Sequence, residues 1–154
     1  MDTSFAGRVY PATAPYEVCR EKIREFADAI GAPHPAHRDA AAARGLGYPD
    51  VVAPATFPIV ITMRAAEAVV FDPELGLDYS RVVHRDQRFV QRRPLVAGDV
   101  VSVTVTVESA KVVAGNAMLG TRADVIDRAG QLVTSAFTTL VARAADDAPA
   151  EAAS

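Results

Sequence analysis

The second half of the chain alternates apolar and polar residues with a period of two. Four valines, at positions 101, 103, 105 and 107, alternate with Ser102, Thr104, Thr106 and Glu108. This pattern predicts a strand with one buried side and one side in water. Turn residues at 115–116 and 128–130 predict two further strands, at 117–126 and 132–143, and a strand at 81–90 is expected before them. Because the turns are short, we expect neighbouring strands to be antiparallel.

The first half of the chain shows helical spacing instead. Apolar residues recur at positions i, i+3, i+4 and i+7, namely Ile23, Phe26, Ala27 and Ile30. This spacing predicts a helix over residues 15–30, with Thr13 as its N-cap and Gly31 at its end. A short alanine-rich helix is expected near residues 39–44.

Residues 56–71 form a segment that is apolar on nearly every side, which is typical of a helix buried on most of its surface. Thr56 is a candidate cap at its start, and Asp72-Pro73 ends it. One long apolar helix followed by strands that each need a covered face predicts an α+β fold, an antiparallel sheet wrapped around that helix. Such a sheet has an edge strand whose backbone N–H and C=O groups can pair with a second subunit, so we expect a dimer.

Composition narrows the class of protein. The chain has 154 residues and fits one domain, expected over residues 1–145, with a small acidic tail at 146–154 that we expect to be disordered. The net charge of −3 gives no basic field for nucleic acid, and no apolar run reaches the roughly 20 residues that span a bilayer. One cysteine excludes an internal disulfide and a thiolate metal cluster, and the start of the chain lacks a secretory signal, so a cytoplasmic protein is expected.

The most informative motif lies at residues 31–39, which read G-A-P-H-P-A-H-R-D after the aromatic Phe26. It resembles the hydratase signature of the MaoC-like hot-dog proteins, G-D-x-N-P-I-H followed two positions later by an acid. The matching positions are Gly31, Pro35, His37 and Asp39. Two positions differ, because Ala32 stands at the signature aspartate and His34 at the asparagine.

The resemblance extends over about residues 5–145. The segments that carry it are 7–11 (G-R-V-Y-P), 16–26, 45–57, 83–87 (V-H-R-D-Q), 94–99 (P-L-V-A-G-D) and 138–143. In this order they are similar to the FAS1-like dehydratase-subunit branch of the family, which includes one of the two components of the heterodimeric (3R)-hydroxyacyl-acyl-carrier-protein dehydratase. The resemblance implies the hot-dog fold.

It also implies a chemistry. In the family an aspartate and a histidine act together on a 3-hydroxyacyl or enoyl thioester. The thioester oxygen accepts hydrogen bonds from backbone N–H groups, including those at the start of a helix. His37 matches the histidine, and Ala32 removes its partner. Matching positions suggest five substrate-binding residues: Ala55, Thr56, Phe57, His84 and Gln87. The expected role is the substrate-holding half of a heterodimer with a catalytic MaoC-like subunit, with a homodimer as the other option; no cofactor and no metal is expected.

Each histidine also has a plainer interpretation. His37 is equally well an ordinary loop histidine, and His34 a solvated one. His84 falls within a predicted strand, where a backbone carbonyl often satisfies the ring. Asp28 and Asp39 are the nearby acids, but neither stands at the position of the missing aspartate.

Residues 81–93 contain five arginines and a single acid, Asp86. Coenzyme A carries phosphates and acyl-carrier proteins are acidic, so four of these arginines are candidates for docking the carrier: Arg85, Arg88, Arg92 and Arg93. The alternative is a strand edge protected against aggregation by charge.

Two other function classes remain open. Ala32 also fits a non-catalytic protein that binds acyl groups or acts as a scaffold. Hot-dog thioesterases place a catalytic carboxylate on the central helix, and Glu67 is the only acid within residues 56–71. We rank this thioesterase hypothesis last, because an otherwise apolar helix is expected to turn its one acid outward.

Overall fold

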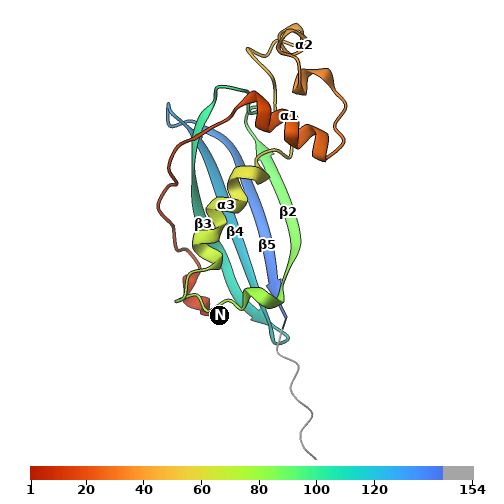
Figure 1. Cartoon of the computed structure of the whole chain (residues 1–154). Helices are drawn as coiled ribbons and strands as arrows, with labels where there is room; N and C mark the ends of the chain where they lie inside the picture. Colours follow the sequence, from red (N-terminus) through yellow and green to blue (C-terminus); the bar gives the residue numbers. More distant parts are fainter. Residues whose placement is uncertain (144–154) are drawn as a thin grey trace, which may run out of the picture.

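The structure, a computed structural model, describes residues 1–143. It contains one antiparallel sheet in the order β1-β3-β4-β5-β2 (Figure 1). The strands are β1 (Tyr16–Glu17), β2 (Val82–Gln91), β3 (Val100–Val113), β4 (Asn116–Asp127) and β5 (Leu132–Ala142). The four strands predicted from residue 81 onward are confirmed. The expected domain end at 145 and the tail at 146–154 lie outside the described residues.

The central helix, α3 (Ile59–Val70), lies against the inner side of the curled sheet (Figure 1). Ile61, Ala65 and Val69 of this helix are buried against the sheet together with the valines of β3. The α+β prediction of a sheet around a long helix is therefore confirmed. The expectation that the helix is buried on most sides is wrong for the chain by itself, since Met63 is 55% exposed and Phe71, its C-cap, 60%.

The start of α3 also differs from the prediction. Thr56 does not cap the helix, which begins three residues later with Pro58 at the N-cap. The Thr56 carbonyl instead accepts a hydrogen bond from the Ile59 amide (3.1 Å), so that residues 54–58 form a turn ahead of the helix. Proline at this position fits, because the first turn of a helix leaves its N–H groups unpaired in any case.

The first long helix, α1 (Arg20–Ala29), starts five residues later than the spacing predicts. Tyr16 and Glu17 pair with Val101 and Val100 as the short strand β1, which draws the chain into the sheet before the helix begins. Thr13 is accordingly no helix cap; its Oγ1 accepts a hydrogen bond from the Val103 amide (3.1 Å).

The ends of the helical part follow the sequence more closely. Gly31 terminates α1 with a φ of 65°, a left-handed conformation that glycine adopts without steric cost. Asp39 caps the predicted short helix, α2 (Ala40–Gly45), by accepting from the Ala41 amide (2.6 Å). Between them lies a short 3₁₀ helix, η2 (Pro35–His37).

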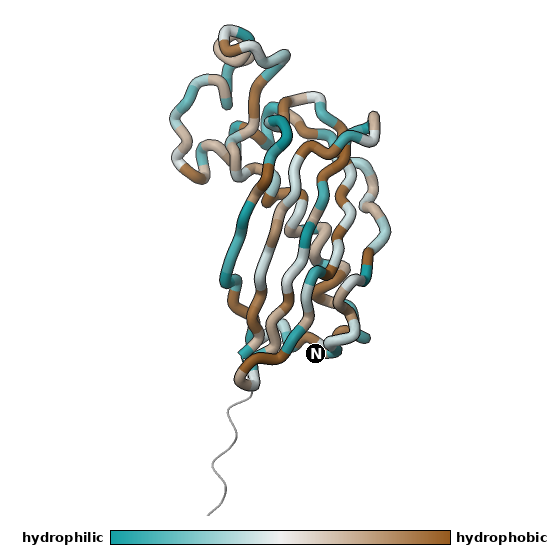
Figure 2. Tube along the Cα trace, turned by 180° about the vertical axis from the view of Figure 1, so that it is seen from behind, coloured by the Kyte–Doolittle hydropathy of each residue, from teal (hydrophilic) through white to brown (hydrophobic). Residues whose placement is uncertain are grey.

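These helices lie at one end of the sheet, beyond the start of α3 (Figure 1). Seen from behind in Figure 2, polar and apolar residues alternate along the strands, as their period of two predicts. No helix within residues 1–143 has the length and apolar character needed to cross a membrane. The end of the sheet that α1, η2 and α2 cover is where the signature motif lies.

Candidate functional site

The signature loop, residues 30–39, is hydrogen-bonded to Val52, which lies shortly before α3 in the chain. The Ala36 carbonyl accepts from the Val52 amide (3.1 Å), and His37 Nδ1 lies 2.7 Å from the Val52 carbonyl oxygen. Because a carbonyl oxygen only accepts, Nδ1 carries the hydrogen and donates it. The lone pair of the neutral ring is then on Nε2, the nitrogen that remains able to accept a proton.

His34 has a different task in the same loop. Its Nδ1 accepts a hydrogen bond from the Ala36 amide (3.2 Å), which caps η2. The rings of His34 and His37 meet edge to face with their centroids 5.9 Å apart. The residue that replaces the signature asparagine is therefore a local cap on the loop.

No carboxylate forms an ion pair with His37 in the described part of the chain. Ala32 donates from its amide to the Ala27 carbonyl (2.8 Å), and its own carbonyl accepts from Arg38 Nη1 (2.7 Å). The two acids that could substitute are both occupied: Asp28 pairs with Arg38 (3.0 Å from Nε), and Asp39 caps α2. At the position of the missing aspartate, the backbone N–H and C=O of Ala32 are thus both hydrogen-bonded within the chain.

The turn before α3 follows soon after Val52, the residue that binds His37, and its Ala55 carbonyl accepts a hydrogen bond from Gln91 at the end of β2. Phe57 is fully buried and meets Phe26 edge to face, with ring centroids 5.5 Å apart. Ala55 and Thr56 are exposed, and their amides make no hydrogen bond with residues 1–143, whereas the Phe57 amide donates to Pro54 (2.9 Å). Of the three predicted substrate contacts here, only the first two offer free N–H groups to an oxyanion.

Strand β2 carries the other two predicted substrate-binding residues. His84 is exposed, and its Nε2 lies 3.2 Å from the Asp86 carbonyl across a bulge at Arg85. Gln87 Oε1 accepts from Thr138 Oγ1 (2.8 Å), while Gln87 Nε2 is buried and has no partner among the described residues. Rotating the amide would only leave Oε1 without a donor, so one end of this amide lacks a partner in either orientation.

A groove of about 360 Å³ runs between α3 and β2. Its walls are mainly apolar and include Met63, Val70, Phe71 and Leu140, with His84 at the β2 side. Gln91 Nε2 donates to the Ala55 carbonyl (2.7 Å) and so ties the end of β2 to the turn before α3. Of the five predicted substrate-binding residues, His84 alone lines this groove, and Ala55 is connected to β2 through Gln91.

The four candidate docking arginines are not equivalent. Arg93 pairs with Asp99 (2.8 Å) and Asp127 (3.2 Å), and these contacts raise the pKa of its guanidinium. The pKa of Asp127 is lowered, first by the Gln131 amide and then by Arg93. Arg88 stacks over Phe137, 3.9 Å from the ring centroid. Arg85 and Arg92 are exposed.

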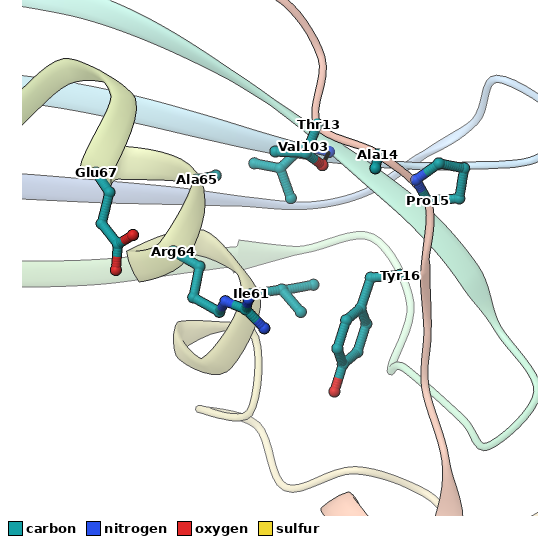
Figure 3. Close-up of a pocket in the computed structure, with 9 residues that line it drawn as sticks. All are labelled: Thr13, Ala14, Pro15, Tyr16, Ile61, Arg64, Ala65, Glu67 and Val103. Atoms are coloured by element: carbon teal, nitrogen blue, oxygen red, sulfur yellow. Dashed lines mark hydrogen bonds between the residues drawn. The ribbon is translucent and has the colours of Figure 1, made fainter. Parts of the chain in front are cut away.

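A second groove, of about 330 Å³, lies on the other side of α3 and gave no signal in the sequence (Figure 3). The segment Thr13–Tyr16 forms one wall, and Ile61, Arg64 and Glu67 line the other. Burial raises the pKa of the Tyr16 hydroxyl there. Glu67 lines both grooves yet is exposed, as its place on an otherwise apolar helix predicts.

Within residues 1–143 no group of three or more histidine, cysteine, aspartate or glutamate side chains is placed to hold a metal ion. Among the described residues, the candidate site thus consists of a loop histidine without a carboxylate, two free backbone amides, an apolar groove lined in part by His84, and a buried glutamine amide with one end unpartnered. Such a set can bind a thioester, and its two imidazoles, His37 and His84, are general-base candidates that form no ion pair with a carboxylate within residues 1–143.

Comparisons with known proteins identify the family to which the chain belongs. The family model described as FAS1-like, dehydratase domain region, matches residues 4–136. A UPF0336 protein of Streptomyces griseus is 60% identical over 148 residues, which is 96% of this chain and 99% of that protein.

Two solved structures are similar over most of the chain. A MaoC-like dehydratase superposes with a TM-score of 0.85 at 37% identity, covering 93% of this chain but only 43% of that one. The HadBC (3R-hydroxyacyl-ACP dehydratase) complex of Mycobacterium tuberculosis gives a TM-score of 0.79 at 34% identity, over 92% of this chain and 99% of the matched chain. The protein is therefore a hot-dog chain that belongs to the FAS1-like, MaoC-like dehydratase family.

Proposed function

We propose that this chain is the substrate-holding subunit of an enzyme that dehydrates (3R)-3-hydroxyacyl thioesters or hydrates the corresponding enoyl thioesters. A second, MaoC-like subunit with an intact G-D-x-N-P-I-H motif carries the acid–base chemistry. The observation behind this proposal is that Ala32 stands at the position of the signature aspartate and that His37 forms no ion pair with a carboxylate within residues 1–143.

The reaction explains why one group is not enough. Removing water from a 3-hydroxyacyl thioester requires taking the α-proton and giving a proton to the leaving hydroxyl. Neutral His37 can accept one proton at Nε2, and Ala32 can neither give nor take one. Each positioned acid or base contributes about 10²–10⁴ in rate, so the chain alone should be slower by that factor or more.

The holding role rests on the groove between α3 and β2. Its apolar walls suit an acyl chain, which gains about 0.8 kcal/mol for each buried CH₂ group. The free amides of Ala55 and Thr56, together with the unpartnered Gln87 amide, are hydrogen-bond donors for a thioester oxygen. His84 lines the same groove and completes the predicted substrate contacts.

A partner is expected because the same side of the molecule remains open. Met63 and Phe71 are more than half exposed beside the groove, and a second hot-dog subunit would cover them. The similar HadBC protein bears the name of a complex, which supports an assembly of two different hot-dog chains for this protein.

The carrier of the acyl group is either coenzyme A or an acyl-carrier protein. Arg85, Arg88 and Arg92 are the exposed members of the predicted docking set, but Arg88 stacks on Phe137, and Arg93 is paired with acids. We therefore assign carrier phosphates, if they bind here, to Arg85 and Arg92.

The test measures hydration of crotonyl-coenzyme A and of a longer enoyl thioester by the purified chain, alone and mixed with a MaoC-like subunit that has the intact motif. We expect the chain alone to be slower than the mixture by a factor of at least about 10². Full turnover by the chain alone would contradict the proposal. Acyl binding without turnover by any mixture would support the non-catalytic alternative.

Two variants locate the chemistry. Replacing the signature aspartate of the partner should abolish turnover by the mixture, whereas His37→Ala in this chain should lower it less than tenfold. A loss of 10² or more on His37→Ala, with an unchanged melting temperature, would place the chemistry in this chain.

A further inference from the structure

The two edges of the sheet differ in whether they are covered. On the β3 side, residues 7–13 run along the strand as a strap. Three of its amides donate to β3 carbonyls: Gly7 to Val107 (2.8 Å), Tyr10 to Val105 (2.8 Å) and Thr13 to Val103 (2.9 Å). On the other side β2 pairs only with β5, and no segment within residues 1–143 covers its outer edge (Figure 1). A ten-residue strand with an uncovered edge is a place for another strand to add.

That open edge is strongly basic. Two arginines flank the strand, Arg81 and Arg92, and two lie near its middle, Arg85 and Arg88. The only acidic residue of the strand is Asp86. None of these four forms an ion pair with a carboxylate in the described chain, in contrast to Arg93, which pairs with Asp99 and Asp127. The edge therefore presents uncompensated positive charge to whatever strand pairs with it.

The spacing of these arginines works against self-pairing. When two copies of β2 pair antiparallel with their midpoints aligned, the two-fold axis lies between Asp86 and Gln87. This register sets Arg85 opposite Arg88 and Arg81 opposite Arg92, twice each across the pair. The bulge at Arg85 shifts the pairing by one residue, which still leaves the arginines as diagonal neighbours. Like charges directly opposite one another destabilise a strand pair.

The surface beside the edge nevertheless favours association. Met63, Phe71 and Tyr79 are each about half exposed or more, and with the groove between α3 and β2 they form an apolar area that adjoins the edge. This apolar area favours association with any hot-dog subunit of matching shape, because association removes it from water. The charges along the edge therefore determine which partner binds more tightly.

We propose that the β2 edge rejects a second copy of this chain and selects a hot-dog partner whose edge strand carries acidic residues opposite the four arginines. This inference rests on the proposed function only in taking the partner to be a hot-dog protein. It names the feature that makes the assembly a heterodimer, and a carrier protein bound at these arginines is the competing outcome.

The first test measures self-association of the purified chain by sedimentation velocity. Raising NaCl from about 0.1 M to about 1 M shortens the Debye length from about 10 Å to about 3 Å, so the wild-type homodimer should become tighter with salt. A tight wild-type homodimer that salt leaves unchanged or weakens would overturn the inference.

A pair of matched variants tests the arrangement of charges. Arg85→Glu/Arg92→Glu places each new glutamate opposite an arginine in the symmetric register, whereas Arg81→Glu/Arg92→Glu has the same composition but opposes glutamate to glutamate and arginine to arginine. We expect the first to form a homodimer at least about tenfold tighter than the second, and salt to weaken it. Equal dimerisation constants for the two variants would overturn the inference.

An acidic copy of the chain serves as the probe for the partner. Replacing all four arginines by glutamate gives an edge complementary to the wild type, and a mixture of the two should form 1:1 heterodimers at least about tenfold tighter than either homodimer. If loss of the Arg88 stack on Phe137 lowers the melting temperature, the triple variant that keeps Arg88 replaces it.

The control for this mixture is Arg44→Glu/Arg128→Glu, which changes charge at two exposed sites away from β2 and should bind the wild type no more tightly than the wild type binds itself. No association between the acidic copy and the wild type, or weakened carrier binding as the sole effect of the glutamates, would overturn the inference. None of these experiments measures turnover, so their outcome is independent of the outcome of the dehydratase assay.

Discussion

The polar groups of the signature loop and those of the β2 edge differ in whether they have hydrogen-bond partners within the chain. In the loop, His34, His37, Arg38 and Asp39 all bond to groups of the same chain, mostly backbone. On β2, Arg85 and Arg92 face solvent and one end of the Gln87 amide is buried without a partner among residues 1–143. Polar groups satisfied within the chain serve folding, whereas exposed and unpaired ones at an open edge, such as Arg85 and Arg92, are available to a ligand or a second subunit.

This difference changes where the function is to be sought. The loop has the closest resemblance to the hydratase signature, yet its departures at Ala32 and His34 leave it with the contacts of a structural loop. The groove and the edge beside β2 match no catalytic motif, but they hold the donors and the apolar surface that a bound thioester or subunit would use. We therefore expect the loop to govern the stability of the chain and the edge to govern its associations.

The largest expected effect compares two phenylalanines, one in each region. Phe57→Ala removes a fully buried ring that packs on Phe26 beneath the loop, and it should lower the free energy of unfolding by about 3–5 kcal/mol. Phe71→Ala removes a ring that is 60% exposed beside the groove and should cost less than about 1 kcal/mol in the isolated chain. Urea unfolding followed by circular dichroism measures both.

The same pair separates stability from assembly. Phe71→Ala should weaken binding of the catalytic partner, although it hardly changes the melting temperature. If both substitutions destabilise the isolated chain equally, the region beside β2 is closed by contacts of the chain itself and the comparison fails.

The sequence predicts the regular elements well and the site only in part. The period of two in β3 and the apolar positions of α3 are enough to predict the fold, because burial of one face decides both patterns. The predicted start of α1 is wrong, because pairing of Tyr16 with Val101 depends on a strand more than eighty residues away. Local spacing contains no information about such a contact.

The same reason limits prediction of the site. The partners of His37 and Gln87 are a carbonyl at Val52 and a hydroxyl at Thr138, and neither is marked by any local motif. Arg93 resembles its neighbours in sequence, yet the following turn brings Asp99 to it and the end of β4 brings Asp127, so it is part of an ion-pair cluster. Residue type predicts the chemistry available, and tertiary contacts decide which groups remain free.

A second prediction concerns acid stability on the loop side. Arg20 and then the Val51 amide hydrogen-bond to Asp50, just ahead of the residues that bind His37, and lower the pKa of this carboxyl to about 2. Since its folded pKa lies below the ordinary value of 3.8, the stabilisation is complete above that value and is lost as the pH falls through about 2. Asp50→Asn should therefore lower the melting temperature at pH 6–7, by less than Phe57→Ala does, and the difference from wild type should shrink towards pH 2.

Two further variants check the cause. Arg20→Gln should reproduce the pH dependence of Asp50→Asn, because it removes the main partner of the carboxylate. Arg24→Gln, on the same helix but paired with Glu21, should keep the wild-type dependence on Asp50. A difference between wild type and Asp50→Asn that stays constant from pH 7 to pH 2 would assign the stabilisation to something other than the ionised carboxylate.

The smallest expected effect compares two glutamines of β2. Gln91→Met removes an amide that donates to the Ala55 carbonyl, and it should lower the free energy of unfolding by about 1 kcal/mol. Gln87→Met removes an amide with one unsatisfied buried end, so the isolated chain should lose less than that or become slightly more stable. In the mixture with the catalytic partner, Gln87→Met should raise the KM for crotonyl-coenzyme A severalfold with little change in kcat, because a donor in the holding subunit contributes binding alone. An equal stability loss for both variants with an unchanged KM would mean that the Gln87 amide is satisfied within the chain, and β2 would then resemble the loop rather than contrast with it.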